Sequence, residues 1–212
     1  MMLWKFVFVC LCLGVAVASF RWRHSLRDWA WLVGGLAATV AADFFLVLHD
    51  AHLPGVAVFC LAHICYMHRT GAPWRYHQRL ARGLESPRAV SWKVAAHIVI
   101  LLMIIGTLYM LGELMLLVGL YAALFATNLG MNIWWVLQDD HNDKALPPKR
   151  NRALVLVGLV LFMLCDVHVL LFNLPYYMEV PTMPWAFTLI WVFYLPSQAL
   201  LAVSGASRAW RF

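Results

Sequence analysis

The stretch "GLAATVAADFFLVLHDAHLPG" (residues 35–55) joins one long apolar run to the next and holds an acid, Asp43, inside the first of them. An unpaired carboxylate in hydrocarbon costs on the order of several kcal/mol, so an acid at such a position usually faces a protein interior or a wet cavity and has a function there. Partners for Asp43 must therefore come from other apolar runs of the chain.

Composition indicates the solvent that surrounds these runs. Of 212 residues, 64% are hydrophobic and 12% are charged, and the mean hydropathy is +0.76. So little charge cannot cover a soluble globule of this size, whereas a transmembrane helix needs about 20 mostly apolar residues. Seven runs meet or approach that length: residues 3–20, 29–48, 54–68, 92–111, 113–137, 153–174 and 184–204. They predict an all-α, polytopic integral membrane helix bundle of seven spans, forming a single domain over residues 1–212.

Basic residues fall in alternate connections between the predicted spans. They are Arg21, Arg23, Arg27, Arg69, Arg75, Arg79, Arg82, Arg88, Lys93, Lys144, Lys149, Arg150, Arg152, Arg208 and Arg211. Only Lys5 breaks the alternation, and the positive-inside rule places the amino terminus outside or in a lumen and the carboxyl terminus in the cytoplasm. Dispersed over short loops, these charges do not indicate a nucleic-acid partner. The basic connection of residues 70–91 could form a short amphipathic helix on the inner headgroups, with Trp74, Tyr76 and Trp92 at the interface.

Polar residues inside the spans concentrate at one level of the bundle. At about 1.5 Å per residue, Asp43 and Asp166 each lie roughly 20 Å from the cytoplasmic ends of their spans, so both carboxylates share a depth in the outer half. His63 lies within reach of that level, and Tyr66 follows it at i+3 on the same helix face.

Further polar stripes complete this picture. Asp166 and Asn173 are seven residues apart, while Tyr194 and Gln198, like Asn128 and Asn132, are four apart, so each pair shares a helix face. Together these spacings predict a bundle with a wet, acid-lined interior.

Each of these residues also has a structural interpretation. Asn, Gln and Tyr in membrane helices more often join helices than catalyse reactions, and His63 could be a core residue or a ligand. Intramembrane acids are functional by default. The His49 and His52 spacing is a weak metal signal, with no HExxH motif in the chain, and the five cysteines show no CxxC spacing. We therefore predict neither a metal nor a cofactor.

Three blocks resemble one known family. The stretches "ADFFLVLHDAHLPGVAVFCLAHICY", "GLVLFMLCDVHVLLFNLP" and "FYLPSQALLAVSG" are similar, in order and spacing, to the signature of the YhhN-type lysoplasmalogenases. The family's polar residues fall onto Asp43, His63, Tyr66, Asp166, Tyr194 and Gln198. Two neighbours differ from the family pattern, since Ala42 stands for its Gly and Cys165 for its Ser. The family is usually described with eight spans, so the resemblance leaves seven or eight open.

The resemblance implies a membrane hydrolase that cleaves the vinyl ether bond of lysoplasmalogens, with a lysophospholipid as substrate and membrane lipids around it. Such cleavage calls for one protonated acid and one carboxylate, as in glycoside hydrolysis. We expect Asp43 and Asp166 to form this pair, in either order. His63 and Tyr66 would orient a carboxylate or the attacking water, Tyr194 and Gln198 would bind the glycerol or phosphate side, and Asn128 and Asn173 would line the site.

Two other function classes stay open. A lipid or small-molecule transporter, or a binding protein, could use the same acids as a proton relay. A metal-dependent membrane lipid hydrolase would need His and acid ligands on several helices, yet residues 184–204 contain no His. The chain shows no GxSxG motif, no P-loop and no Cys with a suitable His partner, which disfavours serine hydrolases, thiol hydrolases and nucleotide-driven machines.

Overall fold

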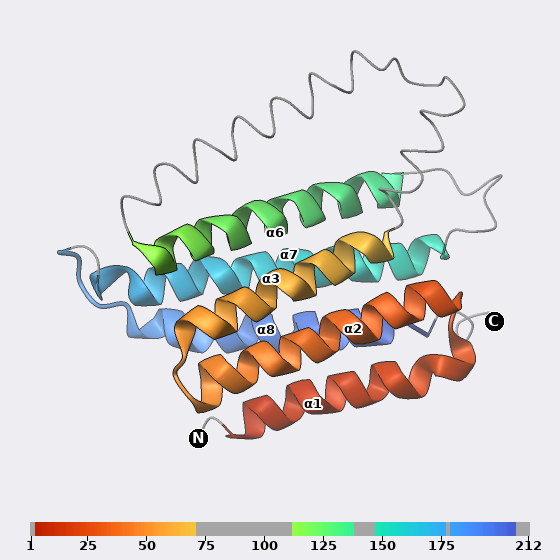
Figure 1. Cartoon of the computed structure of the whole chain (residues 1–212), viewed down its shortest axis with the longest axis horizontal. Coiled ribbons are helices and arrows are strands. Elements are labelled where there is room, and N and C mark those ends of the chain that lie inside the picture. The colour runs from red at the N-terminus through yellow and green to blue at the C-terminus, as the bar shows by residue number, and fades with distance from the viewer. Residues whose placement is uncertain (1–2, 71–111, 138–146, 177–178, 207–212) are drawn as a thin grey trace, which may run out of the picture.

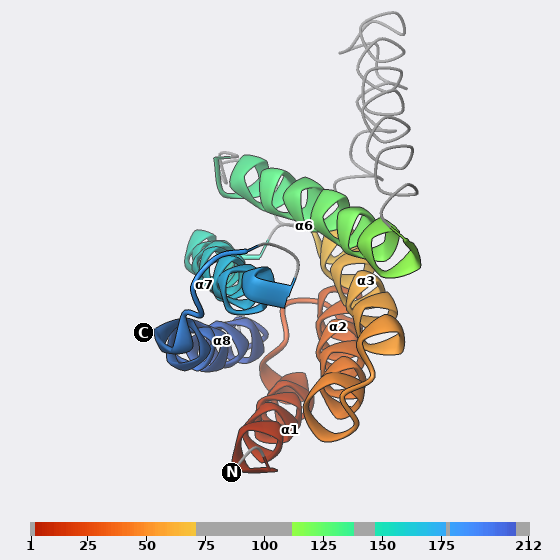
Figure 2. The same cartoon turned by 90° about the vertical axis from the view of Figure 1, so that its left-hand side faces the viewer.

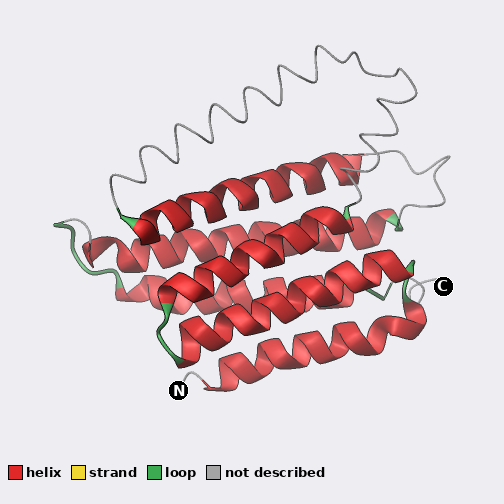
Figure 3. Cartoon of the chain, in the orientation of Figure 1, coloured by secondary structure: helices red, strands yellow, loops and turns green. Residues whose placement is uncertain are grey.

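Six helices lie side by side in the part of the chain that a computed structural model describes, residues 3–70, 112–137, 147–176 and 179–206 (Figure 1). They are α1 (Leu3–Ala18), α2 (Leu26–Asp43), α3 (His52–Arg69), α6 (Glu113–Leu137), α7 (Lys149–Asn173) and α8 (Pro184–Val203). Short turns continue three of them: the 3-10 turns η1 (Ser19–Trp22) and η3 (Leu174–Tyr176), and the π-helical turn η2 (Phe44–Leu48). Figure 3 draws only helices and loops for these residues, which confirms the all-helical prediction there.

Some predictions lie outside the described residues. They are the span over residues 92–111, the interfacial helix with Trp74, Tyr76 and Trp92, and the terminal Arg208 and Arg211.

Five of the described helical segments are long and apolar enough to cross a membrane. They are Leu3–Trp22, Leu26–Leu48, Glu113–Leu137, Lys149–Tyr176 and Pro184–Val203. The helix α3 does not reach the same hydropathy, because His63, Tyr66, His68 and Arg69 are among its 18 residues. Three of these four are buried against neighbouring helices, so the polarity of α3 is directed inward. A transmembrane α3 therefore stays a prediction.

The described helices close into a ring, in which α3 and α6 run in the same direction, as do α8 and α1 (Figure 1). Viewed along the helix axes in Figure 2, α1, α2, α3, α6, α7 and α8 follow one another around the bundle, and α8 packs against α1. Both α2 and α7 begin at the end of the bundle where α1 and α3 finish (Figure 1). We call this end of the bundle the clamp end.

Local sequence explains where two of the helices begin and how closely two pack. The side chain of Ser25 accepts a hydrogen bond from the backbone N–H of Asp28 at 3.1 Å, which caps α2, and Pro184 occupies the first turn of α8, where its missing N–H costs nothing. Gly35 allows α3 to approach α2, because a Cβ there would lie 2.4 Å from the Tyr66 ring.

The clamp end is named for a buried ion pair that joins four helices. The guanidinium of Arg69, at the end of α3, donates to both carboxylate oxygens of Asp28 in α2, at 2.9 and 3.3 Å. It also donates to the side-chain oxygen of Ser204, just after α8, at 2.8 Å, and to its carbonyl at 3.2 Å. Asn151 of α7 donates to the same carbonyl at 2.8 Å. We call these four residues the Arg69 clamp.

The burial of Arg69 differs from the sequence-based prediction, which uses this residue as a marker of a cytoplasmic connection between spans. Arg69 is only 5% exposed, as is Asp28. A second predicted loop cation, Arg152, is fully buried within α7 and donates to the carbonyl of Trp135 near the end of α6. Both arginines therefore tie helix ends together, where carbonyls and a carboxylate supply acceptors.

Removing Arg69 is expected to destabilise the protein strongly. The variant Arg69→Met leaves the Asp28 carboxylate buried without its cation, which costs about 3–5 kcal/mol. Heating in detergent, followed by intrinsic fluorescence, should show a large drop in the unfolding temperature. Arg21→Met, in the exposed connection nearby, is the matched control and should unfold as the wild type does. Equal unfolding temperatures for all three proteins would show that the clamp is not a stabilising element.

Candidate active site

Asp43 is the last residue of α2 and is 4% exposed. The hydroxyl of Tyr194, in α8, donates to its Oδ2 at 2.6 Å. The π-helical turn η2 begins at the next residue, and such turns occur often at functional sites because the extra residue redirects the side chains around it. The acid at the centre of the opening stretch thus meets a phenol from the far end of the chain.

Asp166 has a similar arrangement on the opposite side of the ring of helices. It lies in α7, and the hydroxyl of Tyr121 in α6 donates to its Oδ2 at 2.6 Å. Asp166 is only partly buried, whereas Asp43 is enclosed. Seventeen residues separate Leu26 from Asp43 and Lys149 from Asp166, so each acid stands about 25 Å from the start of its helix, and both helices start at the clamp end.

Tyr121 is a site residue that the sequence analysis missed. A signal for it was present, because Tyr121 precedes Asn128 by seven residues and therefore lies on the same stripe of its helix. A single tyrosine in a long apolar run does not by itself indicate a site. Only the packing of the helices shows that an acid on another helix lies opposite it.

Aromatic rings connect the two tyrosine–aspartate pairs. The ring centroids of Tyr194 and Phe162 are 5.6 Å apart, those of Phe162 and His63 are 5.6 Å apart, and those of His63 and Tyr121 are 5.0 Å apart. We call these four residues the aromatic bridge. Among the described residues the two carboxyl groups make no hydrogen bond to each other, and the aromatic bridge connects their tyrosines through ring contacts.

His63 lies at the middle of the aromatic bridge and is fully buried. Its Nδ1 is 3.2 Å from the amide nitrogen of Asn128, whose amide oxygen accepts a hydrogen bond from Asn132 at 2.9 Å. Because the Asn128 oxygen is engaged, its nitrogen is the donor to Nδ1, and we infer a neutral ring with its proton on Nε2. That Nε2 has no hydrogen-bond partner among the described residues.

Of the remaining predicted site residues, Tyr66 and Gln198 are buried inside the bundle, whereas Asn173 is bonded within its own helix. Tyr66 is buried with its ring 6.4 Å from that of His63, and its hydroxyl is 3.4 Å from Thr39. Gln198 is fully buried, and neither its amide nitrogen nor its amide oxygen finds a partner in the described part of the chain. Asn173 instead donates to the carbonyl of Val169 in its own helix at 2.8 Å, so within the described residues its amide is bonded inside α7 and not to either acid.

The electrostatics of the two acids depend on phenols rather than on cations. Within the described ranges, neither Asp43 nor Asp166 has a Lys, Arg or His within ion-pair distance. The same residues hold no group of three His, Cys, Asp or Glu side chains arranged to bind a metal ion. Through its carboxyl groups and phenols, the arrangement offers proton exchange and hydrogen bonding.

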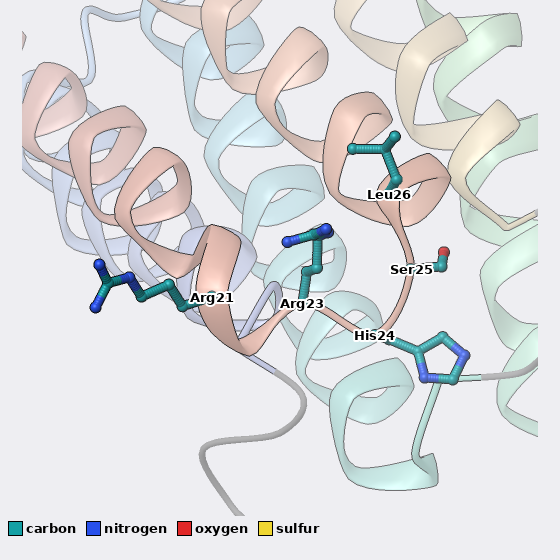
Figure 4. Close-up of a pocket in the computed structure, with 5 residues that line it drawn as sticks. All are labelled: Arg21, Arg23, His24, Ser25 and Leu26. Carbon is teal, nitrogen blue, oxygen red and sulfur yellow. The ribbon is translucent and has the colours of Figure 1, made fainter.

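A surface hollow lies far from this site, at the clamp end. It has a volume of about 250 Å³ and is lined by Arg21, Arg23, His24, Ser25 and Leu26, between η1 and α2. In Figure 4 the side chains of Arg21, Arg23 and His24 point in different directions. They do not converge on one point, as the donors of an anion site would.

Loss of the Tyr194 hydroxyl should destabilise the fold more than loss of the Tyr121 hydroxyl. Tyr194→Phe leaves an enclosed carboxyl oxygen without its donor, at a cost of about 1–3 kcal/mol. Tyr121→Phe removes the donor from a carboxyl group that is only partly buried, so its effect should be smaller. Thermal unfolding in detergent measures both, with Tyr176→Phe, which is 81% exposed, as the control. The reverse order would contradict the difference in enclosure between the two acids.

Comparison with known proteins gives one positive result. No curated protein and no solved structure matches the chain significantly. The model of the YhhN family matches residues 1–205, which include every described element and both tyrosine–aspartate pairs. The chain therefore belongs to the YhhN family.

Proposed function

We propose that this protein is a lysoplasmalogenase, a membrane hydrolase that cleaves the vinyl ether bond of 1-alkenyl-glycerophosphoethanolamine or 1-alkenyl-glycerophosphocholine. Membership of the YhhN family supports a function of this type. The observation that carries the proposal is the pair of aspartates inside an apolar bundle, each held by a tyrosine and neither neutralised by a cation in the described residues.

The reaction needs a proton donor and a proton acceptor. Protonation of the β-carbon of the vinyl ether converts the double bond into an oxocarbenium ion. Water then adds to the carbon next to the ether oxygen and loses a proton, which gives a hemiacetal. Collapse of the hemiacetal releases a fatty aldehyde and the glycerophospho-alcohol. One proton is consumed and one is returned, so a carboxylic acid and a carboxylate suffice without a cofactor.

The two aspartates suit this division of labour. One supplies the proton to carbon, and the other removes a proton from the attacking water. Both keep a second carboxyl oxygen that their tyrosine does not occupy, since each tyrosine donates only to Oδ2. The phenols hold each carboxyl group in one orientation, which favours reaction because the reacting atoms are positioned in advance.

The aromatic bridge adds a second contribution. The oxocarbenium intermediate carries positive charge, and aromatic faces attract cations, with a gain of about 2 kcal/mol or more at desolvated sites. Phe162 and the neutral His63 present such rings between the two pairs. The Nε2 of His63 and the amide of Gln198, which have no partner in the described ranges, are available to bind a water molecule or a glycerol oxygen.

The proposal predicts that both acids are needed for aldehyde release. Asp43→Asn and Asp166→Asn should each lower kcat by about 10²-fold or more, because each removes one partner of the acid and base pair. Purified protein in detergent with a 1-alkenyl lysophospholipid, coupled to an aldehyde-detecting enzyme, measures the rate. Asp50→Asn is the matched control, since the Asp50 side chain is 89% exposed in the loop after η2.

The outcomes separate the candidate functions. Full activity in either buried-acid variant would show that the site is wrong. A wild-type protein that releases no aldehyde but redistributes the lipid across vesicles would favour the transporter with a proton relay. Activity that a chelator abolishes and zinc restores would favour the metal-dependent hydrolase.

A further inference from the structure

Lys5 is a buried cation in the first turn of α1. It is 6% exposed, although it is the basic residue that breaks the alternation of charges along the sequence. A lysine near the end of a membrane helix ordinarily extends its amine toward water and lipid headgroups. The side chain of Lys5 is instead directed into the protein.

Two aromatic rings of α8 and one of α1 lie around the amine. The Nζ of Lys5 lies 3.9 Å from the centroid of the Trp191 ring, 4.7 Å from that of Phe187 and 5.7 Å from that of Trp4. No carboxylate and no hydrogen-bond acceptor is paired with this amine within the described residues. Ring faces stabilise a cation, but they do not replace the oxygen acceptors that the three N–H donors of an ammonium prefer. Lys5 with the rings of Trp191 and Phe187, which we call the box, is thus suited to an anion that accepts hydrogen bonds from the amine.

The box adjoins the Asp43 site. Trp191 contacts Tyr194, with ring centroids 5.9 Å apart, and Tyr194 donates to Asp43. A second contact supports the same placement, because the ring of Phe6, next to Lys5, lies 6.5 Å from the ring of Phe44, next to Asp43. The start of α1 and the end of α2 therefore lie together at the end of the bundle opposite the clamp (Figure 1).

We propose that Lys5, with Trp191 and Phe187 around its amine, recognises the phosphate group of the lysophospholipid substrate. This inference rests on the proposed function for the identity of the reacting bond. In a lysoplasmalogen, only the three glycerol carbons and one phosphoester oxygen separate the oxygen of the vinyl ether from phosphorus. A phosphate on Lys5 would thus leave the vinyl ether close to the ring of Tyr194 and to Asp43.

The orientation of a lipid substrate in the membrane agrees with a phosphate at Lys5 and a vinyl ether near Asp43. Lys5 lies in the first turn of its helix, whereas the five residues of η2 still separate Asp43 from the loop that follows. The charged headgroup would lie nearer the membrane surface, and the reacting bond and alkenyl chain would lie deeper. This is the order that an amphipathic lipid adopts at an interface.

The test compares substrates with and without phosphate. Lys5→Met should raise KM for 1-alkenyl-glycerophosphocholine about tenfold or more, since a charge-assisted contact is lost. It should leave the kinetics with 1-alkenylglycerol, which lacks phosphate, unchanged. Lys5→Arg keeps the charge and should retain most of the preference. Lys149→Met, an exposed lysine at the clamp end, is the matched control. Lys5→Gln repeats the measurement if the Met variant fails to elute as a folded protein.

Binding provides a readout that does not depend on hydrolysis. The affinity of the non-hydrolysable 1-alkyl-glycerophosphocholine, followed by tryptophan fluorescence, should fall about tenfold in Lys5→Met. Affinity for 1-alkylglycerol should stay constant. A wild-type protein that binds inorganic phosphate at Lys5 but shows no phosphate-dependent binding of the lipid would identify a free anion as ligand and overturn the assignment.

The two proposals fail in different ways. If the wild type hydrolyses the vinyl ether and Lys5→Met matches it in both KM and lipid affinity, the phosphate site is wrong and the reaction stands. If the wild type releases no aldehyde and Lys5→Met still loses affinity for the phosphate-bearing lipid, the reaction is wrong and the phosphate site stands.

Discussion

Polar groups inside this bundle depend on one another for hydrogen bonds, because hydrocarbon offers them no water. Partners therefore come from different helices. Arg69 reaches Asp28 and Ser204, Arg152 reaches the Trp135 carbonyl, and each buried acid reaches a tyrosine. These contacts select the neighbours of each helix, since an apolar surface alone would pack against many alternatives.

The two ends of the bundle use charge differently. At the clamp end the guanidinium of Arg69 and the carboxylate of Asp28 face each other directly, and the guanidinium makes four hydrogen bonds to Asp28 and Ser204. At the opposite end a cation and an acid lie on adjoining aromatic residues without pairing: Lys5 rests on Trp191, and Asp43 accepts from Tyr194. A direct pair would stabilise the fold, but it would also occupy both groups. Groups kept apart in this way can each take the role proposed for it, Asp43 in catalysis and Lys5 in phosphate binding, at some cost in stability.

Hydropathy alone located the described helices well. The predicted spans 113–137 and 184–204 agree with α6 and α8 to within one residue, and 29–48 and 153–174 lie within a few residues of the helical segments Leu26–Leu48 and α7. Such agreement is expected, because span length is set by the membrane and not by the partners of each helix. Asp43 and Asp166 were also recognisable, since an acid inside an apolar run is conspicuous.

The sequence by itself determined the helical class, the positions of the long apolar helices and the identity of the two acids inside them, all of which follow from one-dimensional hydropathy. Only the tertiary structure decided which tyrosine holds each acid, that His63 and Phe162 stand between them, and that Arg69 and Lys5 are buried. The physical reason is that helical spacing shows which residues share a face, but not which face of which helix lies opposite. A tyrosine or lysine becomes part of a site only through partners from distant segments, and packing alone brings those together.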